Sequence, residues 1–196
     1  MADDKDDIER RRFFRIEDEI CLEITVVTEQ EYGNAQQDLT KTQQTAFSLS
    51  ANFATMNHDY LPMMNSIRSA YPEIAQYLDL INRKMDSLSQ HLLDEELPCA
   101  DNNKHKVNIS ASGIALDSTQ SYSINQPLKL RLVLLPEKIG LELYGRVVNT
   151  QAASGTDDKT HISIDFEFLR NEDQELLIRH NLNKQMQELR EKSGNN

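Results

Sequence analysis

The 196-residue sequence lacks several features that would place it in common functional classes. No apolar run approaches the roughly eighteen residues that cross a bilayer, because Lys129 and Arg131 interrupt the longest candidate, 128–135. Basic residues are not in excess either. The net charge of −11 disfavours binding to long nucleic acids, which requires an electric field that attracts phosphate. We therefore expect neither membrane insertion nor a DNA or RNA partner.

Cysteine is scarce as well. The two cysteines, Cys21 and Cys99, are too few for a disulfide framework, and neither stands in a metal-ligand spacing. Four aspartates fall within residues 3–7, where a secretory signal would have basic residues followed by an apolar stretch. These features predict a cytoplasmic protein with reduced thiols and no bound metal.

Residue patterns typical of catalysis are also missing. The five histidines show neither metal-ligand nor triad spacing, and the sequence contains no phosphate-binding loop. Ser110 and Ser112 lack the flanking glycines of a nucleophile elbow. We expect a protein that is not an enzyme and that needs no cofactor.

The sequence does contain short segments in which apolar and polar residues alternate, as in half-buried β-strands. The first begins at Ile16 and continues to Val26, and the same alternation returns late in the chain. The expected strands are 16–26, 104–110, 114–117, 128–134, 139–143 and 162–168. Turn signals such as Ser112-Gly113 and Pro136 separate them. About six short strands in this arrangement predict an antiparallel barrel or a sandwich.

A seven-residue periodicity occupies residues 29–98 and predicts two helices that pack along a seam, joined by a turn at 66–71. Pro72 suits the first position of the second helix. Before Pro72 the repeating positions are Leu39, Ala46, Phe53 and Tyr60, interleaved with Thr42, Leu49, Met56 and Met63. After Pro72 they are Ile74, Ile81 and Leu88, interleaved with Leu78, Met85 and Leu92. A third helix is expected from Asn171, as a cap, to about residue 192.

This hairpin has two interpretations. Its apolar face could lie on the barrel of its own chain, or the seam could be shared with other copies. Neither helix alone would be stable in water without a partner, and the number of heptad positions favours self-association without distinguishing a dimer, a trimer and a tetramer. The predicted organisation is a β-barrel unit formed by 1–28 and 99–196, interrupted by a helical insertion at 29–98.

Against the acidic background, a cluster of arginines forms a local positive site ahead of the first expected strand. Its members are Arg10, Arg11, Arg12 and Arg15. The planar guanidinium of arginine pairs with phosphate oxygens and with the O6 and N7 edge of guanine, and it stacks on bases. The alternative interpretation is a solvated basic arm that is neutralised by the neighbouring acidic residues.

A second pattern is Asn108-x-Ser110-x-x-Gly113. Asn108 and Ser110 are two residues apart on an expected strand and therefore share a face. Gly113 has no Cβ, which permits close approach of a ligand, and an Asn side chain can accept hydrogen bonds from guanine. A small, doubly anionic guanine nucleotide would satisfy both patterns. The alternative is a hairpin whose polar side chains cap its own backbone.

At these residues the chain resembles the PilZ family, the bacterial receptors for cyclic di-GMP. The resemblance rests on RxxxR at Arg11 and Arg15, on the NxSxxG motif that begins at Asn108, and on the order of the strands. It covers roughly residues 8–28 and 103–192. It implies a mainly β fold with added α structure: a six-stranded antiparallel barrel with a C-terminal helix, here interrupted by the helical hairpin.

The resemblance also implies roles for individual residues. Arg11 and Arg15 would clamp the nucleotide, Asn108, Ser110 and Gly113 would line the other side, and Arg10 would influence how many ligand molecules bind. Family members usually have the two motifs close in sequence, whereas here 93 residues separate Arg15 from Asn108. This arrangement resembles an unusual branch in which helical insertions drive assembly, up to tetramers, and some members lose ligand binding.

We therefore predict a cyclic di-GMP receptor that assembles through its helical insertion. The alternative is an oligomeric interaction scaffold whose PilZ-like barrel does not bind nucleotide. No residue of the sequence identifies the downstream protein partner.

Overall fold

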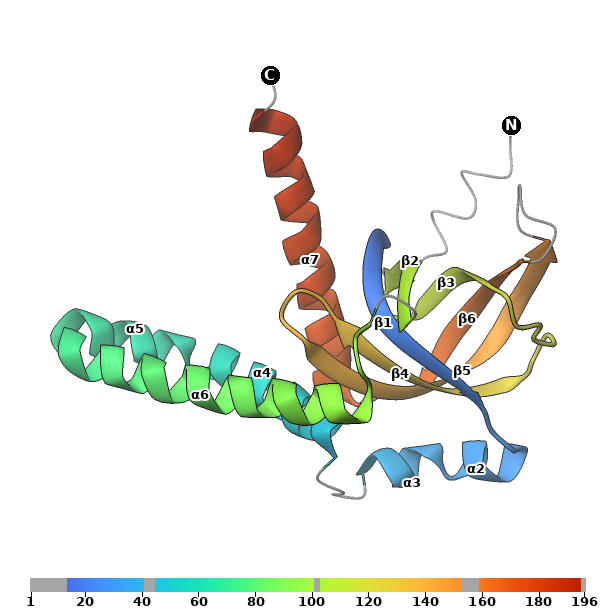
Figure 1. Ribbon diagram of the computed structural model, residues 1–196, viewed down its shortest axis with the longest axis horizontal. Coiled ribbons are helices and arrows are strands. Elements are labelled where there is room, and N and C mark those ends of the chain that lie inside the picture. Colours follow the sequence, from blue (N-terminus) through green and yellow to red (C-terminus); the bar gives the residue numbers. More distant parts are fainter. Residues whose placement is uncertain (1–13, 41–44, 101–102, 153–158, 195–196) are drawn as a thin grey trace.

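Figure 1 shows the computed structural model: a closed barrel with a pair of helices extending to one side and a further helix projecting beyond it. The structure describes residues 14–40, 45–100, 103–152 and 159–194. The six strands are β1 (Ile16–Val26), β2 (Lys104–Ser110), β3 (Gly113–Ser118), β4 (Pro127–Leu134), β5 (Ile139–Ala152) and β6 (Thr160–Phe168). They close in the order β1-β2-β3-β6-β5-β4. The barrel prediction is confirmed over the sandwich, and β5 continues well beyond the expected residue 143.

The barrel closes because the alternating residues of each strand supply one continuous apolar interior. In β4 the inward-facing residues Leu130 and Leu132 are completely buried, and they pair across the sheet with Ile24 and Leu22 of β1. Complete burial of such a side chain is worth about 1.5–3 kcal/mol, so this interior is the main stabilising element of the barrel. Leu176 and Leu177 of the C-terminal helix pack into the same cluster.

Six helices accompany the barrel in the part of the chain that the structure describes. They are α2 (Glu29–Gly33), α3 (Ala35–Thr40), α4 (Ala46–Asp59), α5 (Leu61–Ala70), α6 (Pro72–Glu96) and α7 (Asn171–Gly194). Helix α6 begins at Pro72, as predicted, but the turn before it is shorter than the expected 66–71, because α5 continues to Ala70. The first half of the expected hairpin differs from the prediction, since it is divided among α2, α3, α4 and α5. We call α5, α6 and the second half of α4 the arm.

The short helices α2 and α3 lie on the outer face of the barrel instead of beginning the arm. Tyr32 of α2 is buried and packs edge-on against Tyr144 of β5 and Phe168 of β6, with ring centroids 6.2 and 5.2 Å away. The guanidinium of Arg146 lies 4.3 Å from the centre of the Tyr32 ring. These aromatic contacts hold the chain against the barrel immediately after β1.

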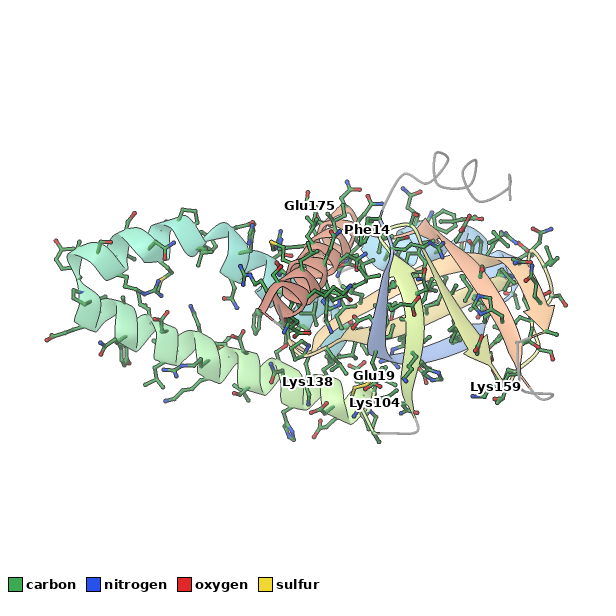
Figure 2. All side chains as sticks on the ribbon, turned by 90° about the horizontal axis from the view of Figure 1, so that it is seen from above. Phe14, Glu19, Lys104, Lys138, Lys159 and Glu175 are labelled. Carbon is green, nitrogen blue, oxygen red and sulfur yellow. A yellow bond between two sulfur atoms is a disulfide. The ribbon has the colours of Figure 1, made fainter. Side chains whose placement is uncertain are left out.

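The base of the helical insertion docks on the outside of β1, β4 and β5. Phe47 of α4 and Leu93 of α6 are buried there against Val133. A Cβ atom on Gly140 would lie 2.6 Å from Leu93 Cδ1 and 2.9 Å from Phe47 Cδ1, so any larger residue would force these side chains to move. Figure 2 shows Lys138 where the insertion meets the barrel, and its Nζ donates to Asp94 Oδ2 of α6 at 2.6 Å.

The cysteine prediction is wrong in this structure. Cys21 of β1 and Cys99, just after α6, form a disulfide with a Cα–Cα distance of 5.5 Å. Both lie in the cluster at the base of the insertion, where β1 and the end of α6 are packed together. The bridge therefore ties the helical insertion to the barrel at the point where the chain returns to it.

The apolar heptad residues of α6 do not pack inside the hairpin of a single copy. Ile74 and Leu88 are 54% and 60% exposed. The contacts between α6 and its neighbours in the arm are instead partly polar, with Arg68 Nη2 3.1 Å from Asp79 Oδ2. The periodicity is present as predicted, but its apolar face is left largely exposed in one copy of the chain.

Candidate functional site

Arg15 stands immediately before β1, at the barrel edge where the sequence places it. Its Nη2 lies 3.4 Å from the position that a Cβ on Gly113 would occupy. Arg15 of the first motif is therefore adjacent in space to Gly113 of the second, although the helical insertion separates them in sequence. Arg10, Arg11 and Arg12 lie outside the described residues.

Gly113 is the first residue of β3 and faces Asp165 of β6, its Cα partner. A Cβ here would lie 2.7 Å from the Ile164 carbonyl oxygen and 3.3 Å from Asp165 Oδ1. The glycine is needed for the close approach of β3 to β6. The same bare backbone leaves room for the Arg15 guanidinium and places the Asp165 carboxylate near it.

Asn108 lies on the outer face of β2, since its neighbours Val107 and Ile109 point into the barrel and are buried. Its Cα partner on β1 is Glu17, two residues after Arg15. The Asn108 Nδ2 donates a hydrogen bond of 2.6 Å to Glu17 Oε1. Arg15, Glu17 and Asn108 thus form one polar surface across the start of β1 and the end of β2.

Ser110 is buried, with 1% of its surface exposed. Its hydroxyl donates to the Gly113 carbonyl at 3.3 Å and accepts from the Ser112 amide at 3.3 Å. Ser110 therefore closes the β2–β3 turn, which is the role that the alternative interpretation of the motif gave it. Closing the turn also holds Gly113 in place beside Arg15.

Asp18, which follows Glu17 in β1, faces α7. Its carboxylate contacts His180 Nε2 at 2.6 Å and Lys184 Nζ at 2.7 Å, and the Asp18 and His180 side chains are 3% and 4% exposed. Burial acts to raise the pKa of Asp18, but the hydrogen bonds to His180 and Lys184 outweigh it and hold the pKa below its usual value. The strand that carries Arg15 is thereby attached to the C-terminal helix.

A cleft of about 420 Å³ lies between β1, β2 and α7, next to the Asn108–Glu17 pair. Charged side chains dominate its lining, among them Glu17, Lys106 and Lys184. In the described residues, no group of His, Cys, Asp and Glu side chains is arranged to hold a metal ion. No described helix is long and apolar enough to span a bilayer.

Sequence reasoning identified Arg15, Asn108 and Gly113 but missed Glu17 and Asp165. For Glu17 a signal existed, because it lies two residues after Arg15 in the extended chain that begins the expected strand, and such residues share a face. For Asp165 the sequence holds no comparable signal, since its position beside Gly113 depends on how β3 pairs with β6.

Comparison with known proteins identifies the family and the fold of the barrel. Residues 91–182 match the family described as PilZ domain. The chain contains a PilZ domain. The match begins within α6 and ends within α7, so β1 and Arg15 lie outside it. No curated protein matches the sequence.

Two solved structures share the fold to different extents. A pathogenic protein of Xanthomonas campestris, described as a tetrameric PilZ domain self-assembled via an unusual helical bundle, has a TM-score of 0.57 at 15% identity, covering 96% of this chain and 95% of that one. The Bacillus subtilis inhibitor of motility MotI/DgrA has a TM-score of 0.45 at 13% identity. That match covers 91% of this chain, which spans about half of the Bacillus protein, 52%. The first of these supports the PilZ-like architecture of the whole chain.

Proposed function

We propose that this chain is a cyclic di-GMP receptor of bacterial second-messenger signalling, acting in the cytoplasm and without catalysis. The observation that carries the proposal is the position of Arg15 against Gly113, with Asn108 on the neighbouring strand. PilZ domains are usually receptors for this nucleotide. The proximity of Arg15 to Gly113 despite the long insertion supports a site formed by the two motifs.

In the proposed complex, the guanidinium of Arg15 pairs with a phosphate or with the O6 and N7 edge of a guanine. Arg11 completes the clamp, and Arg10 sets how many nucleotides bind. Asn108 accepts hydrogen bonds from guanine, Gly113 allows close approach, and Ser110 holds the turn. Neither a metal nor a cofactor takes part.

Titration calorimetry of the full chain with cyclic di-GMP tests this proposal. We expect micromolar or tighter binding that is lost in Arg11→Ala and in Arg15→Ala. Arg83→Ala is the matched control, because it removes the same charge from the exposed surface of the arm. Absence of heat in the unaltered protein at high nucleotide concentration would favour the alternative function, an interaction scaffold whose barrel does not bind nucleotide.

We further propose that the helical insertion, residues 29–98, assembles copies of the chain. The supporting observation is the outward apolar face of α6, which includes Ile74, Ile81 and Leu88. The similar Xanthomonas protein is described as assembling through a helical bundle. Burying this face against the same face of other copies would give it the partner that it lacks in one chain.

Light scattering on the full chain tests the assembly. We expect a dimer or a tetramer, and a monomer for the double variant Ile81→Glu/Leu88→Glu. Gln76→Glu/Ser87→Glu adds the same charge to the other side of α6 and should leave the oligomer intact. A monomeric unaltered protein at working concentration would contradict this part of the proposal, without affecting nucleotide binding.

A further inference from the structure

Asn108 differs from a carboxylate in one respect that matters for recognition. Its side-chain amide has an acceptor end, Oδ1, and a donor end, Nδ2. An amide that is free to rotate by 180° presents either end to a ligand. Recognition of guanine requires the acceptor end, since the ring N–H and the amino group of guanine are both donors.

The structure contains a group that selects the orientation. The Glu17 carboxylate only accepts hydrogen bonds, and it takes the Asn108 Nδ2 at 2.6 Å. The two residues are Cα partners on β1 and β2, so the backbone pairing holds them opposite each other. Using the donor end for Glu17 turns the acceptor end of the amide away from the carboxylate.

We propose that Glu17 is a positioning residue that sets base selectivity by holding Asn108 with its acceptor end toward the nucleotide. This inference rests on the proposed function. Adenine presents an acceptor at N1 beside its amino donor, whereas guanine presents two donors at the corresponding edge. A fixed acceptor on Asn108 therefore favours guanine over adenine.

The charge of Glu17 considered alone predicts the opposite effect on nucleotide binding, so the two explanations can be distinguished by experiment. Glu17 places a negative charge beside a site for a doubly anionic ligand. If Glu17 had no positioning role, neutralising it would strengthen binding by relieving repulsion. Under the proposal, neutralising it weakens binding of the guanine nucleotide.

Calorimetry of the full chain with cyclic di-GMP and cyclic di-AMP tests this inference on Glu17→Gln. We expect affinity for cyclic di-GMP to fall by about tenfold and its preference over cyclic di-AMP to shrink, because a Gln amide can donate to Asn108 as well as accept from it and so no longer fixes the orientation of Asn108. The matched control is Glu19→Gln, the same change two residues along β1 at an exposed position opposite Lys106. Figure 2 places Glu19 well away from Phe14 and the start of the strand. Glu19→Gln should bind equally well or slightly more tightly.

A swap of the pair provides a second test. Asn108→Asp alone brings two carboxylates into contact and should weaken binding. Glu17→Gln/Asn108→Asp restores one donor and one acceptor, because the new amide on β1 can donate to the new carboxylate on β2 in place of the original bond. This double variant should recover most of the affinity. The inference would be overturned if Glu17→Gln and Glu19→Gln bound cyclic di-GMP with equal affinity. It would also be overturned if the double variant lost as much affinity as the two single variants together.

The outcomes also separate this inference from the proposed function. If the unaltered chain binds neither nucleotide, the receptor proposal fails and the role of Glu17 fails with it. If the unaltered chain binds cyclic di-GMP and Glu17→Gln binds it equally well with unchanged selectivity, only the inference about Glu17 fails. Thermal unfolding of each variant confirms that the barrel is intact.

Discussion

The barrel and the arm contain the same kinds of apolar side chain at regular spacing but bury them differently. Leu130 and Leu132 of β4 are fully enclosed, whereas Ile74 and Leu88 of α6 are more than half exposed. The barrel completes its interior within one chain. The arm is held partly by exposed pairs such as Arg68–Asp79, which contribute less than about 1 kcal/mol each. The difference indicates that the barrel completes its core within one chain, whereas the proposed assembly would bury the exposed face of the arm.

Identical leucine truncations in the two regions test this comparison and give the largest expected effect. Leu132→Ala leaves a cavity in the closed interior and should lower the free energy of unfolding by about 2–5 kcal/mol. Leu88→Ala removes the same atoms from an exposed face and should weaken assembly instead. Denaturant unfolding at several protein concentrations measures both.

The dependence on concentration distinguishes the two variants. The loss caused by Leu132→Ala should be similar at every protein concentration, because the cavity lies within one chain. The unfolding midpoint of Leu88→Ala should fall most at low concentration, where assembly is weakest. A concentration-independent loss of the same size in both variants would remove the distinction between barrel and arm.

The disulfide joins the two regions, and breaking it gives the next largest effect. Cys21 and Cys99 are 78 residues apart, so the bridge restricts a long loop of the unfolded chain. Reduction should lower the free energy of unfolding by about 2–4 kcal/mol. The measurement is denaturant unfolding with and without dithiothreitol. Cys99→Ser should resemble the reduced protein and show no response to the reductant.

Arg131 forms a polar link between the same regions. Its guanidinium contacts Glu23 of β1 at 3.2 Å, pairs with Glu96 of α6 and lies 4.3 Å from the centre of the Phe47 ring. Arg131→Met should cost about 1–3 kcal/mol, because these carboxylates lose their shared partner. Hydrogen exchange should rise in α4 and at the end of α6 while β2 and β3 stay protected.

Lys129→Met is the control for Arg131→Met. Lys129 lies two residues earlier on the same outer face of β4 and pairs with Glu142 at 3.0 Å, but no described contact joins it to α6. Hydrogen exchange in α6 should therefore be unchanged. Equal exchange in both variants would show that Arg131 does not hold the insertion.

The barrel could be predicted from the sequence because its signal is local. A two-residue period reports which side chains share a face of a strand, and β2 begins and ends at the residues expected from it. The helices α2 and α3 were missed although a local signal was present. Thr28 and Glu31 form a capping box at the start of α2, and this pattern is readable in the sequence.

Other features could not be predicted, since they depend on how distant segments meet. A heptad pattern identifies the residues that share a face of α6, but it does not say whether that face meets α4 or another chain. Likewise, nothing in the spacing of Cys21 and Cys99 indicates that β1 and the end of α6 are packed together. At the candidate site, the proximity of Arg15 and Gly113 was expected from the family resemblance, whereas the Glu17–Asn108 bond required the strand register.

The smallest expected effect concerns the attachment of α7, which joins the barrel through Asp18. The pKa of this carboxyl is below its ordinary value in the folded protein, so its contribution to stability is present above about pH 4, the ordinary value in the unfolded chain, and is lost as the pH falls through the folded pKa. Asp18→Asn should lower the free energy of unfolding by roughly 1 kcal/mol near neutral pH. The difference between the variant and the unaltered protein should shrink in acid. Glu188→Gln is the matched control, because it removes a carboxylate from the exposed side of α7, near Lys192. A difference between Asp18→Asn and the unaltered protein that stays constant down to about pH 2 would show that the Asp18 charge does not hold α7 to β1.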